Sequence, residues 1–261
     1  MSRGLNSPDA DALFARHRIV LRHADDAAAT GAALDTQRDI GRLIDRFGQA
    51  IGAPDRRTAG SLFVKRYCSV IAGALELWAH CGERLYLGPG GVEARMSEDG
   101  ELTFLVLKPD RSIDPAGDCS TRDDEALRHL MAEGACRVLG LAAAHARVAK
   151  AVLWAHVSYL LVYRFEEWLR EAGSAELRER LEGLYVRLFE RPDVAWFPGY
   201  GAVPLTNGFR RIGNPLREGE TIMVRSKCCL SFRLPGGDRY CYTCPLVSDD
   251  DKLNRYARLY G

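Results

Sequence analysis

The feature that most constrains this chain is a group of four cysteines near its C-terminal end. Cys228 and Cys229 are adjacent, and after eleven intervening residues Cys241 and Cys244 follow as a C-x-x-C pair. Four thiolates that lie together can hold a tetrahedral zinc ion or an iron–sulfur cluster. The other cysteines are scattered over the first part of the chain, where we expect buried, apolar roles. These are Cys68, Cys81, Cys119 and Cys136.

The residues between the two cysteine pairs predict a hairpin. Residues 229–234 and 238–242 are the predicted strands, and Pro235-Gly236-Gly237 is the turn that joins them. Neighbouring residues of a strand point to opposite faces, so two adjacent cysteines fit a two-iron cluster with less backbone distortion than a single ion. This geometry favours a [2Fe–2S] cluster. A structural zinc-binding interaction domain without redox activity and a C-x-x-C thiol redox pair are the alternatives.

The cysteine-containing segment resembles the FhuF-like ferric-siderophore reductases, an unusual [2Fe–2S] family. The resemblance rests on the adjacent cysteines with Leu230, on the run from Arg233 to Gly237, and on Cys244-Pro245-Leu246. The spacing between the two cysteine pairs is one residue longer than in the family pattern. Further upstream, residues 152–157 are similar in character to a tryptophan-bearing helix of the family.

The resemblance implies an enzyme that passes one electron from a [2Fe–2S] cluster on the four C-terminal cysteines to a ferric siderophore, with release of ferrous iron. The sequence contains neither a G-x-G-x-x-G motif between a strand and a helix nor a P-loop. A separate electron donor, a ferredoxin, a flavodoxin or a reductase, is therefore implied. A further alternative is a siderophore-binding or biosynthetic relative in which the cluster only senses the redox state.

A locally basic stretch surrounds the first cysteine pair. From Gly208 to Tyr240 there are seven basic residues against three acidic ones. Many iron–siderophore complexes are anionic, and arginines can attract and bind them. The cations could instead be ordinary solvated side chains or could offset the charge of the cluster. An aromatic helix residue is a further candidate for the substrate pocket. The predicted substrate-binding residues are Arg210, Arg225, Lys227, Arg233 and Trp154.

The overall composition excludes a strong electrostatic attraction to nucleic acid or to an acidic membrane, because 36 basic residues nearly balance 35 acidic ones. The first ten residues contain no apolar h-region of a secretory signal. The longest apolar stretch, residues 151–163, is too short to span a bilayer. We therefore expect a cytoplasmic protein with no nucleic-acid partner and at most peripheral membrane association.

Hydrophobic periodicity predicts a mostly helical α+β fold with a small antiparallel sheet and a C-terminal iron–sulfur hairpin. The predicted helices span residues 9–22, 36–50, 58–81, 121–145, 147–172, 177–191 and 249–259. The predicted strands of the sheet span residues 84–87, 92–96 and 102–107. We divide the chain into a helical α+β body, 1–220, which includes the siderophore-binding region, and a [2Fe–2S]-binding segment, 221–261.

Overall fold

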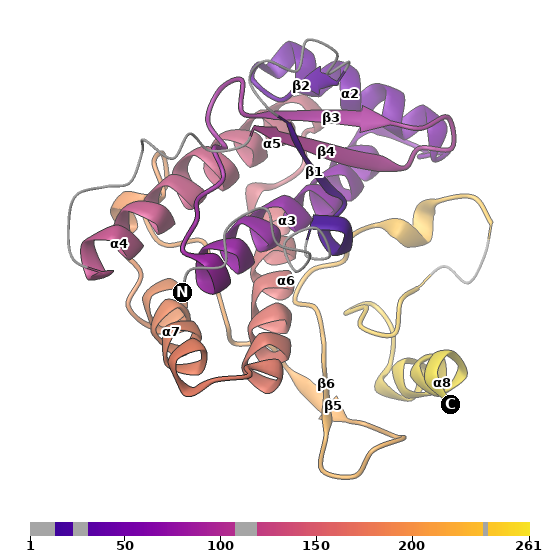
Figure 1. Cartoon of the computed structure of the whole chain (residues 1–261). Coiled ribbons are helices and arrows are strands. Elements are labelled where there is room, and N and C mark those ends of the chain that lie inside the picture. The colour runs from indigo at the N-terminus through magenta and orange to yellow at the C-terminus, as the bar shows by residue number, and fades with distance from the viewer. Residues whose placement is uncertain (1–13, 23–30, 108–118, 237–239) are drawn as a thin grey trace.

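The fold is organised around one long helix, α3 (Arg56–Cys81), which is buried on almost every side. A helix that is apolar all round belongs in the interior of a domain. Accordingly α2 (Gln37–Ala50), α5 (Val138–Ala146) and α6 (Lys150–Glu171) pack against α3, as Figure 1 shows. This computed structural model describes residues 14–22, 31–107, 119–236 and 240–261.

The ends of α3 follow from its sequence. The Asp55 side chain caps the first turn by accepting a hydrogen bond from the Thr58 N–H at 2.7 Å. Gly82 ends the helix with a φ of 69°, the left-handed conformation that glycine adopts without strain. Near its start, α3 lies so close to α5 that a Cβ at Gly60 would come within 2.2 Å of the Ala146 Cβ. The predicted helix 58–81 is confirmed.

A four-stranded mixed sheet lies beside the N-terminal helices, with strand order β1-β4-β3-β2. The strands are β1 (Ile19–Arg22), β2 (Ala32–Ala33), β3 (Val92–Met96) and β4 (Leu102–Leu107). β3 pairs antiparallel with both β4 and β2, whereas β1 runs parallel to β4. The predicted strands 92–96 and 102–107 are confirmed, and the sheet is mixed because of the parallel edge strand.

Two predictions for this part of the chain are wrong. The predicted helix 9–22 ends in β1, because Ile19, Val20 and Leu21 pair with β4, which lies far along the chain. Residues 9–13 of that prediction lie outside the described residues. The predicted strand 84–87 contributes one isolated bridge, between Tyr86 and Leu107, because Tyr86 alone of this segment meets β4.

The second half of the chain is mainly helical, which confirms the predicted mostly helical α+β class. α4 (Cys119–His129) continues through a π-helix, Leu130–Arg137, into α5. α7 (Ala175–Tyr185) likewise ends in a π-helix, Val186–Glu190, and a 3₁₀ turn, Val194–Trp196, follows. Periodicity predicts these as continuous helices and does not reveal the π segments. Of the helices described, none has the length and apolar character needed to cross a membrane.

The C-terminal segment lies along one side of this body (Figure 1). β5 (Arg211–Gly213) and β6 (Thr221–Met223) form a two-stranded antiparallel sheet. After a 3₁₀ turn, Ser231–Arg233, the described chain ends in α8 (Asp249–Tyr260). Ser248 caps α8 by accepting a hydrogen bond from the Asp251 N–H at 3.2 Å, and the predicted terminal helix is confirmed.

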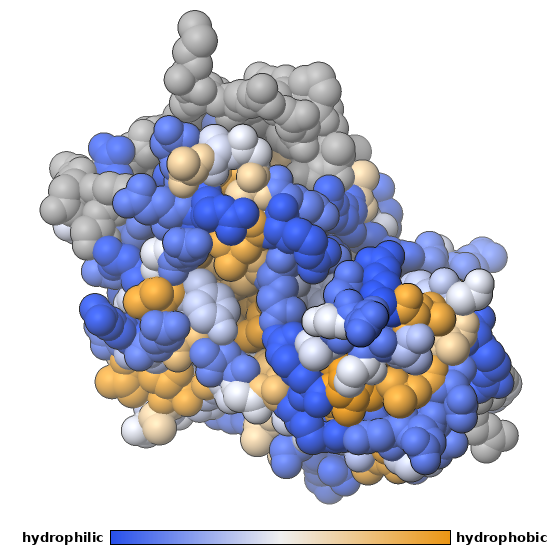
Figure 2. All heavy atoms as spheres, turned by 90° about the horizontal axis from the view of Figure 1, so that it is seen from below, coloured by the Kyte–Doolittle hydropathy of each residue, from blue (hydrophilic) through white to orange (hydrophobic). Residues whose placement is uncertain are grey.

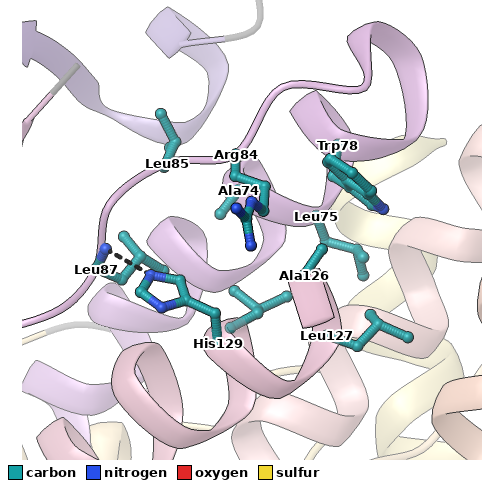
Figure 3. Close-up of a pocket in the computed structure, with 10 residues that line it drawn as sticks. Ala74, Leu75, Trp78, Arg84, Leu85, Leu87, Ala126, Leu127 and His129 are labelled. Atoms are coloured by element: carbon teal, nitrogen blue, oxygen red, sulfur yellow. Dashed lines mark hydrogen bonds between the residues drawn. The ribbon is translucent and has the colours of Figure 1, made fainter. Parts of the chain in front are cut away.

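A small pocket lies between α4 and the C-terminal part of α3 (Figure 3). Its lining is apolar apart from Arg84 and His129. The Leu87 N–H donates to His129 Nε2 at 3.2 Å. Burial lowers the pKa of His129, which keeps the ring neutral and able to accept this bond. The lining offers little to bind an anionic iron complex, so we assign the pocket a packing role.

Candidate metal centre

The four C-terminal cysteines lie on a largely irregular segment that follows β6. Cys229 and Cys244 are each 2% exposed, and Cys228 and Cys241 are half-buried. The Sγ atoms of Cys228 and Cys244 are 3.8 Å apart. Two thiolates that bind one tetrahedral metal ion at about 2.3 Å lie roughly 3.8 Å from each other. The spacing of this pair therefore suits two ligands of one metal ion.

The arrangement fits a two-iron cluster better than a single zinc ion. A structural zinc needs four ligands around a single ion, whereas a [2Fe–2S] cluster distributes four cysteines over two irons. One close pair with two further thiols on the same segment suits the second case. Cys229 and Cys241 supply the two remaining thiols of this segment.

The backbone at the adjacent cysteines is a turn, so the predicted strand 229–234 is wrong. Leu230 has a φ of 68°, which interrupts any extended conformation, and its N–H lies 3.3 Å from Cys228 Sγ as a hydrogen-bond donor. A turn removes the alternation of side chains that a strand would impose on neighbouring cysteines. Residues 237–239 of the second predicted strand lie outside the described residues, and residues 240–242 are not a strand.

Polar groups lie close to the sulfur atoms. Ser231 Oγ is 3.4 Å from Cys229 Sγ, and Thr243 Oγ1 is 3.5 Å from Cys241 Sγ. The Cys244 N–H donates to the Cys241 carbonyl at 3.0 Å, which closes the C-x-x-C turn. Hydrogen bonds to ligand sulfurs orient the ligands and tune the metal, so this environment suits a redox cluster.

One face of α3, which we call the α3 contact face, holds the cysteine segment. It consists of Thr58, Ser61 and Lys65, which are three and four residues apart and so lie on the same side of the helix. Thr58 Oγ1 accepts from Arg233 at 3.3 Å, and Ser61 Oγ donates to the Cys229 carbonyl at 3.1 Å. Lys65 Nζ lies 3.7 Å from Cys229 Sγ. The contact face therefore fixes both the backbone and the sulfur of Cys229.

His156 on α6 contacts Ser61, the residue that holds the Cys229 carbonyl. Its Nε2 lies 3.0 Å from Ser61 Oγ, and the ring is 2% exposed. Since the Ser61 hydroxyl has one hydrogen and donates it to Cys229, His156 must donate through Nε2. Burial, together with the positive charges of Arg225 and Lys65, lowers the pKa of His156 to about 3, so the ring is neutral. This histidine is therefore a buried core residue.

Two of the predicted substrate-binding cations are engaged in ion pairs. Arg210 makes two hydrogen bonds to the Asp249 carboxylate, at 2.6 and 2.8 Å, on the first turn of α8. Arg233 pairs with Asp55 at 2.5 Å, the same carboxylate that caps α3. These contacts attach the C-terminal segment to itself and to the body. They also neutralise part of the positive charge that the sequence predicts here.

The other two predicted cations are less neutralised. The Arg225 guanidinium lies 4.0 Å from the centre of the Tyr159 ring, and its Nε donates to Thr243 at 3.3 Å. Lys227 is exposed to solvent, directly before the first cysteine pair. Hydrophilic residues cover much of the surface seen in Figure 2, with hydrophobic patches between them. Leu246, two residues after Cys244, is one exposed apolar side chain at this end, 58% exposed.

Comparison with known families now decides the nature of the segment. Residues 225–246, which include all four cysteines, match the model of the FhuF 2Fe-2S C-terminal domain. Because of this match, we call residues 225–246 the FhuF-type domain. The predicted [2Fe–2S] cofactor is confirmed, and the zinc alternative is not supported. No curated protein matches the chain. The division of the chain at residue 220 stays a prediction.

The thiols of the FhuF-type domain differ in acidity. Burial raises the pKa of Cys228 to about 12 and raises that of Cys244 as well. Burial also acts to raise the pKa of Cys229, but Lys65, Ser231 and Arg225 outweigh it and lower the value. A cluster needs all four cysteines as thiolates, so its assembly releases protons. The lowered pKa of Cys229 favours the thiolate form that binds metal.

Trp154 does not lie on the surface of the FhuF-type domain. Its side chain is 1% exposed and packs edge-to-face against Phe197 and Tyr200. The indole is therefore part of the core in this structure, and it does not contribute to the exposed surface that carries Lys227.

Ser61 and Lys65 are functional candidates that sequence reasoning misses. A signal exists, because the polar residues Thr58, Ser61 and Lys65 recur at helical spacing within a helix that is otherwise largely apolar. Such a stripe indicates a polar contact at that face. It does not show that the partner is a cysteine segment more than 160 residues away.

Substitution Ser61→Ala should weaken the attachment of the FhuF-type domain. It leaves the Cys229 carbonyl and His156 Nε2 buried without their common partner. We expect a loss of about 1–3 kcal/mol in the free energy of unfolding, measured by urea denaturation, and faster loss of cluster absorbance in air. Ser69→Ala on the same helix is the control, because the Ser69 hydroxyl donates only to the Arg66 carbonyl one turn earlier. Equal effects of both variants would contradict a specific role of Ser61.

Proposed function

We propose that this protein reduces ferric iron in siderophore complexes by one electron, drawn from the [2Fe–2S] cluster of its FhuF-type domain, and so releases ferrous iron. The observation that carries the proposal is the match of residues 225–246, with all four cysteines, to the FhuF 2Fe-2S C-terminal domain. Cys228, Cys229, Cys241 and Cys244 would hold the cluster.

One-electron reduction of a ferric siderophore requires little of the protein beyond the cluster and a position for the complex near it. Siderophores hold ferric iron with hard oxygen ligands, and a gain of one electron weakens that binding. No general base or nucleophile is required. The protein must bring the complex near the cluster, and the half-buried Cys228 and Cys241 place two ligands within reach of the surface.

Substrate attraction is assigned to the cations that are least neutralised, Lys227 and Arg225. Both precede the first cysteine pair, and positive side chains there would attract an anionic complex. Arg210 and Arg233 contribute less, since each is paired with a carboxylate. The electron would come from a separate donor, a ferredoxin, a flavodoxin or a reductase, and the exposed Leu246 would lie in its contact area.

The test is a single-turnover reaction without oxygen. Protein reduced with dithionite and freed of excess reductant is mixed with a ferric siderophore, while the visible spectrum of the cluster and a ferrous-specific chelator are followed together. We expect one ferrous iron for each cluster reoxidised. The gallium(III) complex of the same siderophore is the matched control, because it has the same charge and cannot be reduced. A cluster that stays reduced with the ferric complex would refute the proposal.

Lys227→Glu should impair substrate capture more than electron transfer. Reversal of this exposed charge should raise KM for an anionic ferric siderophore roughly three- to tenfold with little change in kcat, and added salt should shrink the difference. Steady-state assays at two ionic strengths measure this. Arg128→Glu, a charge reversal at another exposed residue, on α4, is the control. Similar KM values for both variants and the parent would contradict a role of Lys227.

A further inference from the structure

Lys65 is the one cationic member of the α3 contact face, and its position is set by the core of the protein. The helix around it is held by buried neighbours, and its Nζ lies 3.7 Å from Cys229 Sγ. Ser61, one turn earlier, fixes the carbonyl of the same cysteine at 3.1 Å. Two contacts from one rigid helix therefore hold this ligand on both its backbone and its side chain.

The charge of Lys65 is directed at the metal centre. No ion pair joins Lys65 to a carboxylate within the part of the chain that the structure describes, and the side chain is half-buried. Arg225 also faces Cys229, but its guanidinium is stacked on Tyr159. The negative group closest to the Lys65 ammonium is therefore the Cys229 thiolate once the cluster is bound.

We propose that Lys65 sets the reduction potential of the [2Fe–2S] cluster by favouring its reduced form. Reduction adds one electron, and so one negative charge, to a cluster held by four thiolates. A fixed positive charge beside one ligand sulfur lowers the free energy of the more negative state, and groups that surround the ligands of a cluster tune its potential in this way. With Lys65 in place, the cluster accepts an electron from a weaker reductant.

This role deepens the proposed function, because it rests on the cluster. It does not require that a siderophore be the substrate. The potential is measured on the protein alone, by titration with dithionite against redox mediators and EPR detection of the reduced cluster. A failure of the siderophore assay and a failure of this proposal are thus separate results.

The decisive variant is Lys65→Met, which keeps the length and the apolar stem and removes the charge. We expect the equilibrium constant for reduction by a given donor to fall at least tenfold, which is about 59 mV for one electron. Lys65→Arg keeps the charge, and its equilibrium constant for reduction should stay within threefold of the parent value. Arg66→Met, an exposed neighbour on the same helix, removes an equal charge and should leave the potential unchanged.

Three results would overturn the proposal. One is an equilibrium constant for reduction of Lys65→Met that lies within threefold of the parent value. Another is an equal shift in Arg66→Met, which would indicate a general effect of net charge. The third is a Lys65→Arg potential as low as that of Lys65→Met. Iron content is measured for each variant. If Lys65→Met does not retain the cluster, Lys65→Gln is judged by the same limits. Loss of the cluster in both neutral variants, with retention in Lys65→Arg, would assign Lys65 to assembly instead.

Discussion

Cys229→Ser is expected to abolish the cluster. After identical anaerobic reconstitution, bound iron and visible absorbance should fall at least about tenfold, since even the loss of an outer partner of a metal ligand costs that much. Ferric-siderophore reduction should fall in parallel. Cys229 is the most informative of the four cysteines because it is 2% exposed, it is fixed by Ser61, and neighbouring charges lower its pKa. A serine hydroxyl at this position would be a poor iron ligand.

The control for this experiment is a cysteine outside the FhuF-type domain. Cys81→Ser replaces a half-buried cysteine at the end of α3 and should leave iron content and spectrum unchanged. Circular dichroism of both variants shows whether the body stays folded. A Cys229→Ser protein with the full spectrum of the parent would remove Cys229 from the ligand set. Loss of the cluster in both variants would point to a general folding defect.

The parts of the fold that could be predicted are those determined by local sequence. α3 could be predicted because a capping aspartate, apolar residues at helical spacing and a terminal glycine all agree over residues 55–82. β1 could not, because Ile19–Arg22 becomes a strand only through its parallel pairing with Leu102–Leu107. Ile19 and Val20 suit a strand, but so short a segment does not show with which strand it pairs.

In the candidate site, too, some features could be predicted from the sequence and others could not. The four cysteines could be found from their spacing alone, whereas the conformation between them could not. The predicted strand at 229–234 gives way to a turn because Leu230 adopts a left-handed conformation and its N–H meets Cys228 Sγ. Ser61 and Lys65 support Cys229, and both come from a helix in the first third of the chain. Their roles depend on where the body places α3.

Trp154→Ala is expected to cause the largest loss of stability among the substitutions considered. Trp154 is among the largest fully buried side chains, and it contacts Phe197 and Tyr200 edge-to-face. Removal of a buried aromatic side chain leaves a cavity that surrounding residues fill only in part, at a cost of about 3–5 kcal/mol in the free energy of unfolding. Urea denaturation followed by circular dichroism measures this loss.

The same position tests the sequence-based prediction that Trp154 binds substrate. Trp154→Phe keeps an aromatic ring in the core and should cost roughly 1–3 kcal/mol. Both variants, assayed at a temperature where they remain folded, should keep the cluster spectrum and the parent KM, because the indole is only 1% exposed. A core residue acts on the stability of the whole protein, whereas a ligand contact acts on KM alone. A Trp154→Ala protein as stable as the parent but with a KM raised tenfold would place the indole in the substrate site and require the helix α6 to open there.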